Sequence, residues 1–203
     1  MLFNILNLCL LFGFCVAFNF GLTRILRKKR IFQPIYESSP VTHQKKDSIP
    51  SFGGVGILLS VLAGIVLLSI QDSRLLWVSG LIFLFGILGF IDDYLSVSKG
   101  KNKGLSARHK LLCQTGIAIL GMWVYDVHFQ VLSIGVFVFY VFVIVGASNA
   151  ANMTDGLDGL LAGLSLITLS GFWLYTRFIH WEEASYFCLS LMLGVLAFLV
   201  FNV

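Results

Sequence analysis

Charged side chains are scarce in this 203-residue chain: only 12% of its residues are Asp, Glu, Lys or Arg, while 58% are hydrophobic. Average soluble domains are about 25% charged and 45–50% apolar, so this composition excludes an ordinary soluble domain. The four cysteines lie inside apolar runs without metal-ligand spacing, which disfavours both a metal cluster and disulfides. HExxH, HxxxH, Walker A, GxGxxG and GxSxG patterns are also absent, which argues against a zinc site, a nucleotide-binding P-loop and a nucleophile elbow.

Long apolar runs are abundant instead, and each was compared with the ~20 residues needed to cross a bilayer. We expect an all-α fold, a polytopic transmembrane helical bundle of about seven spans that forms a single integral membrane domain over residues 1–203. The first run has no charged leader or small-residue cleavage site, which favours a retained span over a cleaved signal peptide. The fourth run is short and fits a tilted or partly re-entrant helix. The runs are Leu2–Leu22, Phe52–Ile70, Leu75–Ile91, Leu111–Tyr125, Val131–Ser148, Leu160–Ile179 and Ala184–Val203.

Lysine and arginine are unevenly distributed along the chain. Seven of them follow the first run and five follow the third, so that of all fourteen only Arg74 and Arg177 lie elsewhere. The positive-inside rule then places these two segments in the cytoplasm and the N-terminus outside. Strict alternation makes the Asn149–Gly159 segment cytoplasmic as well. Five aromatic residues lie toward the opposite ends of the spans, as interface anchors do: Trp77, Trp123, Tyr125, Tyr175 and Trp181. The three polar clusters that could carry chemistry all fall on one side of the membrane.

The first polar cluster leads into the second apolar run. Pro50 biases the residue before it toward an extended conformation, and the Gly53-Gly54 pair allows a ligand to approach the backbone closely. Lys46, ahead of this turn, suits a phosphate. An ordinary positively charged flank of a helix explains the same residues, and the sequence leaves both interpretations open.

The second cluster is the carboxylate pair Asp92-Asp93 at the end of the third run, with five cationic residues after it. Runs of charge are usually solvated loops whose charges pair with one another. The alternative is a magnesium site beside phosphate-binding bases, because Mg²⁺ uses one or two carboxylates together with substrate phosphates.

The third cluster follows an apolar run that contains no Asp, Glu, Lys, Arg or His. Asn149, Asn152, Asp155 and Asp158 recur every three residues and share one stripe if the segment is helical. Carboxylates at a membrane end are costly unless they face water, a cation or a partner. The GxxxG pattern from Gly159 favours close helix packing, but it does not account for the four polar residues.

Together these clusters resemble the polyprenyl-phosphate N-acetylhexosamine-1-phosphate transferase family, over essentially the whole chain from His43 onward. The Thr-Asp-Gly-Leu-Asp-Gly-Leu sequence is the most specific motif. Lys-Gly-Leu at positions 103–105 favours the muramoyl branch of the family over the N-acetylglucosamine branch. The segments that carry the resemblance are Lys46 with Ile49–Gly54, Gly89–Tyr94, Lys103–Lys110 and Asn149–Leu160.

The resemblance implies transfer of phospho-MurNAc-pentapeptide from UDP-MurNAc-pentapeptide to undecaprenyl phosphate, giving lipid I and UMP. It further implies Mg²⁺ as cofactor and a place in the bacterial cytoplasmic membrane. The bilayer is then a partner and nucleic acid is not. The sequence does not assign an oligomeric state, and a homodimer is one assembly that it leaves open. Catalytic and metal-binding roles are implied for Asp92, Asp93 and Asp155. Substrate-binding roles are implied for Lys46, Ser51, Lys103, Lys110, Asn149, Asn152 and Asp158.

Two departures from the family pattern qualify what is expected. Ser96 stands where the family often has a lysine three residues after the acidic pair. The chain ends at Val203, before the position of a third essential aspartate and a histidine-rich loop. We therefore expect residues 1–203 to be the N-terminal portion of a longer transferase fold and to be inactive alone. Three alternatives remain open: N-acetylglucosamine-1-phosphate transfer to the same lipid, an ion-coupled transporter, and a non-catalytic membrane fragment.

Overall fold

The computed structural model describes residues 2–29, 52–99, 104–130, 133–155 and 159–202. Every regular element within these ranges is an α-helix, which confirms the all-α prediction. The helices are α1 (Leu2–Lys28), α3 (Gly54–Leu67), α4 (Ser73–Lys99), α5 (Ala107–Phe129), α6 (Ile134–Thr154), α7 (Leu160–Phe178) and α8 (Glu182–Asn202).

Each apolar run found in the sequence coincides with one of these helices. Four of the described helices, α1, α4, α6 and α8, are long and apolar enough to cross a membrane. The short fourth run belongs to a continuous helix of 23 residues, α5, so it contains no re-entrant break. The second run forms a shorter helix than expected, since α3 has 14 residues and about 1.5 Å of rise per residue makes it roughly 21 Å long.

The end of α3 is set by a local backbone motif. Ser69 adopts a left-handed conformation with φ 52°, and the Ile70 N–H donates back to the Ile65 carbonyl at 3.0 Å. This six-to-one hydrogen bond around a left-handed residue is the Schellman ending of a helix. The chain therefore turns before the apolar run is used up.

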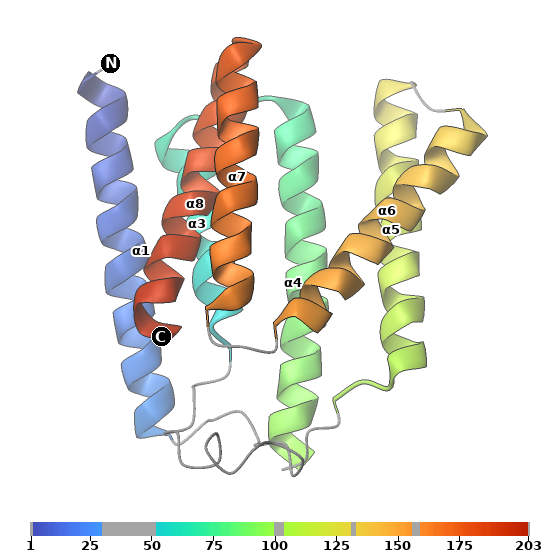
Figure 1. Cartoon of the computed structure of the whole chain (residues 1–203), viewed down its shortest axis with the longest axis horizontal. Coiled ribbons are helices and arrows are strands. Elements are labelled where there is room, and N and C mark those ends of the chain that lie inside the picture. The colour runs from blue at the N-terminus through green and yellow to red at the C-terminus, as the bar shows by residue number, and fades with distance from the viewer. Residues whose placement is uncertain (1, 30–51, 100–103, 131–132, 156–158, 203) are drawn as a thin grey trace.

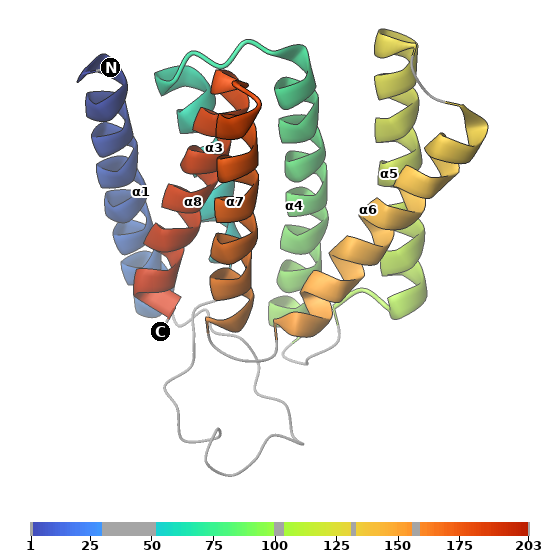
Figure 2. The same ribbon diagram turned by 45° about the horizontal axis from the view of Figure 1, so that its top comes forward.

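The described helices run alternately up and down, as both views of the ribbon show (Figures 1 and 2). The N-terminal ends of α3, α5 and α7 and the C-terminal ends of α1, α4 and α6 consequently lie at one end of the bundle, the lower end in Figure 1. The alternation predicted from the positive charges is thus present in the fold. That this lower end faces the cytoplasm is still a prediction.

Close packing of small side chains joins α3 to α8 and α1. Gly56, Ser60 and Gly64 lie on the buried face of α3. A Cβ atom added to Gly64 would lie 2.5 Å from the Cβ of Ser190, and one added to Gly194 would collide with the Ser60 hydroxyl. Small residues at such spacing let helix backbones approach closely in a membrane.

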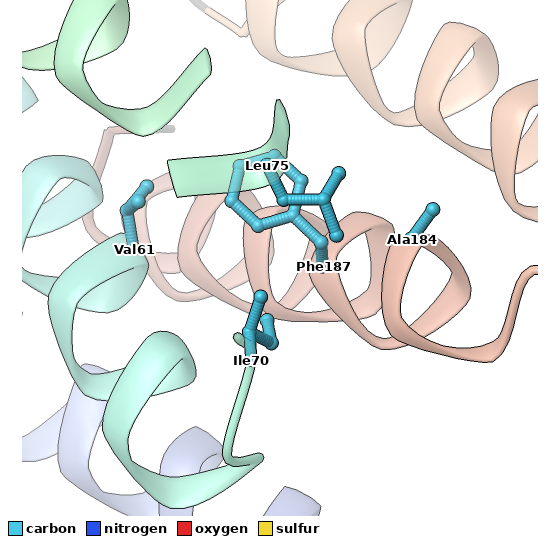
Figure 3. Packing of buried hydrophobic residues seen from close by; sticks show 5 residues of the cluster. All are labelled: Val61, Ile70, Leu75, Ala184 and Phe187. Atoms are coloured by element: carbon cyan, nitrogen blue, oxygen red, sulfur yellow. The ribbon is translucent and has the colours of Figure 1, made fainter. Parts of the chain in front are cut away.

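An apolar cluster then ties α4 to this group of helices (Figure 3). Phe187 of α8 is 5% exposed and packs with Val61 of α3 and Leu75 of α4. Ile70 from the connection between α3 and α4 and Ala184 of α8 complete the cluster. Helices α5 and α6 lie to one side of it, with α5 against α4 and α6 against α5.

Candidate functional site

Three helix ends that are distant in the sequence lie together at the lower end of the bundle. Asp92 and Asp93 lie within the last two turns of α4, Lys110 in the first turn of α5 and Asn152 in the last turn of α6. The α4 helix continues past the apolar run, so the carboxylate pair is helical and does not belong to a loop. Lys110 on α5 therefore faces the carboxylate of Asp92 on α4 and the amide of Asn152 on α6.

Lys110 connects the ends of α4, α5 and α6, and we call this set of contacts the Lys110 junction. Its ammonium Nζ donates to Asp92 Oδ2 at 2.8 Å and to Asn152 Oδ1 at 2.8 Å. The ion pair is partly shielded from water, because the side chains of Lys110 and Asp92 are 18% and 22% exposed. A single cation thus connects a carboxylate of the second polar cluster with an amide of the third.

The other oxygen of Asp92 fixes the segment that precedes α5. Asp92 Oδ1 accepts the Leu105 N–H at 2.7 Å, and a Cβ atom added to Gly104 would collide with the same carboxylate. Ser106 then caps α5 with an extended backbone, and its side chain accepts from the His109 N–H, as N-cap residues do. These contacts begin the helix at Ala107 and so set the position of Lys110.

Asp93 is held by the residue that leads into α3. Its carboxylate accepts the Phe52 backbone N–H and is within electrostatic reach of Asp92, Lys110 and Asp155. Phe52 has a left-handed backbone, φ 69°, and its ring contacts that of Phe90 in a tilted arrangement, with 4.8 Å between centroids. The start of α3 is thereby attached to the acidic pair.

A cavity of about 520 Å³ opens beside these groups. Asp92, Asp93, Lys110, Asn152 and Asp155 all line it, and the rest of its wall is mostly apolar and comes from α3, α4, α7 and α8. The arrangement combines carboxylates, an amide and a cation at the end of an apolar chamber. Such a site can bind an anionic group whose attached chain is apolar.

The polar stripe predicted along residues 149–158 is only partly helical. α6 ends at Thr154, and Asp155 is its C-cap residue with ψ 47°. Asn152 and Asp155 line the cavity, whereas Asn149 does not, because its side-chain NH₂ donates to Gln114 Oε1 at 2.8 Å and to the Val145 carbonyl at 2.9 Å. The substrate-binding role of Asn149 therefore stays a prediction.

Gln114 of α5 was missed by the sequence analysis. It is 2% exposed, and its only sequence signal is a carboxamide inside an apolar run, one helical turn after Lys110. Four of the predicted site residues, Lys46, Ser51, Lys103 and Asp158, lie outside the described residues.

The predicted metal ligands do not form a ready-made cluster. Among the described residues, no three His, Cys, Asp or Glu side chains are grouped closely enough to hold a metal ion. Both oxygens of Asp92 also accept hydrogen bonds, from the Leu105 N–H and from Lys110.

A family model and individual known proteins that resemble this chain indicate the same family. Residues 75–203 match the model of glycosyl transferase family 4. The phospho-N-acetylmuramoyl-pentapeptide-transferase of Geobacillus sp. (strain WCH70) is 37% identical, over 87% of this chain and 60% of the relative. Proteins of that name from Bacillus velezensis and Bacillus subtilis are 35% and 33% identical, over 100% of this chain and 68% of each relative. The chain therefore spans about 60% to 68% of the length of these relatives.

Proposed function

The chain belongs to glycosyl transferase family 4, and on that premise we propose that it carries the inner-leaflet active site of a phospho-MurNAc-pentapeptide transferase. The reaction passes phospho-MurNAc-pentapeptide from UDP-MurNAc-pentapeptide to undecaprenyl phosphate. UMP leaves, and the product is lipid I, a precursor of peptidoglycan. The protein would act in the bacterial cytoplasmic membrane with this end of the bundle facing the cytoplasm.

The observation that carries the proposal is the Lys110 junction. One ammonium group contacts Asp92 and Asn152, each at 2.8 Å, so that the second and third polar clusters share one centre. One substrate is soluble and the other is a lipid whose phosphate lies at the membrane surface, so the chemistry requires a site at helix ends. A transporter would instead place its polar groups near the membrane midplane.

The donor set of the cavity fits a magnesium ion. Mg²⁺ prefers oxygen ligands and is usually held by one or two carboxylates plus substrate phosphates, so Asp93 and Asp155 suffice without a cluster of three. Asp92 would contribute if Lys110 moved to a phosphate. When bound, the ion supplies positive charge that neutralises the phosphates of both substrates.

The residues of the chain would position the reacting groups. Asp92 or Asp93 would contact the lipid phosphate, while Asp155 would face the metal and Asn152 and Asp158 would orient the nucleotide. Lys110 and Lys46 would hold phosphates. Phosphoryl transfer depends mainly on positioning and charge neutralisation, and a lipid phosphate is already largely ionised near neutral pH, with a second pKa of about 6 by analogy with phosphoserine. A strong general base is therefore unnecessary.

Substitution of the three carboxylates tests the proposal. In membranes that contain the full-length protein, Asp92→Asn, Asp93→Asn and Asp155→Asn should each lower the release of radiolabelled UMP by about a hundredfold or more, the usual cost of losing charge stabilisation in an active site. Asp126→Asn, at the other end of α5, is the matched control and should keep full activity. Turnover within about threefold of the parent in all three variants would refute these roles.

The donor substrate is tested with two nucleotide sugars. UDP-MurNAc-pentapeptide should release UMP in the presence of undecaprenyl phosphate, and UDP-GlcNAc should not. Activity with UDP-GlcNAc alone would assign the protein to the other branch of the family.

A further inference from the structure

A buried carboxamide links α5 to α6 directly above the Lys110 junction. Gln114 lies on the buried stripe of α5, whose other members, Ala118, Gly121 and Met122, are apolar or lack a polar side chain. At 2% exposure, it is among the largest fully buried side chains in the described part of the chain. An amide in such a position is costly unless its polar atoms are hydrogen-bonded.

Both polar atoms of this side chain are paired with α6. Gln114 Nε2 donates to Ser148 Oγ at 3.1 Å, and Gln114 Oε1 accepts from Asn149 Nδ2 at 2.8 Å. The same Asn149 nitrogen donates to the Val145 carbonyl one turn earlier in its own helix. Gln114 is therefore held by two consecutive residues of α6, and Asn149 is held in turn by the α6 backbone.

The contacts of Gln114 and Lys110 follow one register. Gln114 lies four residues after Lys110 on α5, and its partner Ser148 lies four residues before Asn152, the partner of Lys110, on α6. The two helices run in opposite directions, with α6 tilted across α5 (Figure 1), and both pairs belong to the same alignment of α5 with α6. A slip of one residue along either helix would move Gln114 out of line with Ser148 and Asn149.

Apolar packing does little to enforce this alignment, because α6 has no buried residue. The ammonium of Lys110 does not fix the alignment of the two helices by itself, since it ends a flexible four-carbon chain. Hydrogen bonds between helices are a recognised means of specifying association in membranes. Two such bonds to one short side chain fix both the height and the rotation of α5 against α6.

We propose that Gln114 is a positioning residue, which sets the register of α5 against α6 so that Lys110 meets Asn152 and Asp92 at the mouth of the cavity. Its effect on substrates acts through Lys110 and so rests on the proposed function. Its effect on the register of the helices does not.

The register is measured by the distance between spin labels. With the native cysteines replaced by alanine, labels are attached at Val127→Cys near the end of α5 and Met153→Cys near the end of α6, both of which are exposed. The parent should give one narrow distance distribution. Gln114→Met keeps the volume but removes the hydrogen bonds, and should shift or broaden the distribution by about 3 Å or more, the rise of two helical residues.

Two further variants make the distance experiment decisive. Ser148→Ala removes one of the two bonds and should change the distribution in the same direction by less. Trp77→Phe removes the bond from Trp77 Nε1 to the Gly121 carbonyl. This bond holds the second half of α5 and does not involve α6, so the substitution should leave the distribution unchanged. A parent-like distribution in Gln114→Met would overturn the proposal.

The link to Lys110 is measured by a double-mutant cycle on the binding of UDP-MurNAc-pentapeptide to the full-length protein. Gln114→Met should weaken binding about tenfold when Lys110 is present and less than twofold in a Lys110→Met background, because residues that act through one another are not additive. An equal loss in both backgrounds would reduce Gln114 to a structural residue and overturn its positioning role. If the parent binds no nucleotide, the proposed function fails, while the label distances still decide the register.

Discussion

At the scale of single residues, Asp92 uses both of its carboxylate oxygens to position neighbouring groups of the protein. One oxygen holds the backbone of Leu105 and the other holds Lys110. The family resemblance predicted a carboxylate pair that faces phosphate or metal. The structure adds that Asp92 also builds the entry into α5, so substitutions there combine a chemical and a structural effect.

Gly104 offers a way to disturb that entry without touching a charge. A Cβ atom at this position would collide with the Asp92 carboxylate and lie 2.6 Å from the Asp92 carbonyl oxygen, so Gly104→Ala must displace the segment that carries Leu105. We expect a loss of stability of about 1–3 kcal/mol, the usual cost of overpacking. A fall in UMP release per folded molecule should accompany it.

The measurement is thermal unfolding in detergent together with the UMP assay. Gly116→Ala is the matched control, because Gly116 is on α5 with nothing within 4 Å of an added Cβ. That change should be neutral or stabilising by up to about 1 kcal/mol, as expected for Gly→Ala inside a helix. Equal effects of the two substitutions would contradict the role given to Gly104.

The sequence pointed to site residues mainly where the chemistry of a side chain is unusual for its surroundings, and the roles assigned to them stay predictions. Asp92, Asp93, Asn152, Asp155 and Lys110 stand out as polar groups at the ends of apolar runs, and all five line one cavity. Gln114 did not stand out, because its partners lie 34 and 35 residues away on another helix. No local pattern encodes such a contact, which exists only once the two helices pack.

At the scale of helices, the membrane makes the spans predictable and leaves their ends less so. In hydrocarbon every backbone polar group must be paired within the helix, so apolar runs and helices coincide. The hydrogen bonds of a helix can continue beyond its apolar part, however. Helices α1 and α4 therefore extend past their apolar runs to Lys28 and Lys99. Conversely, the left-handed Ser69 ends α3 while the sequence is still apolar.

The contact between α3 and α8 should be sensitive to a single methyl group. Gly64→Ala and Gly194→Ala each place a Cβ against a serine of the other helix, Ser190 and Ser60 respectively. Each should lower the free energy of unfolding by about 1–3 kcal/mol, because close-packed helices cannot separate without losing other contacts. The control is Gly80→Ala on α4, where nothing lies within 4 Å of an added Cβ.

Thermal midpoints in detergent micelles report the result. Both interface variants should unfold at a lower temperature than the parent, and Gly80→Ala should not. A parent-like midpoint in Gly64→Ala and Gly194→Ala would mean that the two helices lie further apart than described.

At the scale of the whole molecule, the end of the bundle opposite the cavity is closed by a polar clamp. Glu183 Oε2 accepts the backbone N–H groups of Gln71 and Asp72, each at 2.7 Å, which joins the α3–α4 connection to the start of α8. Asp72 in turn accepts from Trp181 Nε1 at 3.1 Å and pairs with Arg74. The clamp holds together two helix pairs whose other ends form the cavity wall.

Protonation of Asp72 should weaken this clamp. Partial burial raises the pKa of Asp72, but the hydrogen bonds and charge of Arg74 and the bond from Trp181 outweigh it and leave the pKa below its ordinary value. Because the pKa of Asp72 is lower in the folded state than in the unfolded state, the ionised carboxylate stabilises the fold. This stabilisation is fully present above the pKa of the unfolded state, about 3.9 for Asp. It is lost as the pH falls through the pKa of the folded state. The parent should therefore unfold at a higher temperature than Asp72→Asn at about pH 6, and the difference should shrink toward about pH 3. A difference that is constant across this range would show that the Asp72 charge contributes nothing.

The topology predicts which ends of the helices can be reached from each side of the membrane. Ser98 near the end of α4 and exposed Met153 at the end of α6 lie at the cavity end, while Gln130 and His180 follow the opposite ends of α5 and α7. In a protein without native cysteines, a membrane-impermeant maleimide added to intact cells should label Gln130→Cys and His180→Cys. It should label Ser98→Cys and Met153→Cys only after the membrane is permeabilised, because the positive-inside rule predicts that this end faces the cytoplasm. If positions 98 and 153 were labelled from opposite sides of the membrane, Asp92, Lys110 and Asn152 could not share a centre, and the site itself would be refuted.

If the labelling of all four positions were reversed together, the site would survive. It would then face away from the soluble nucleotide substrate, and the proposed function would fail.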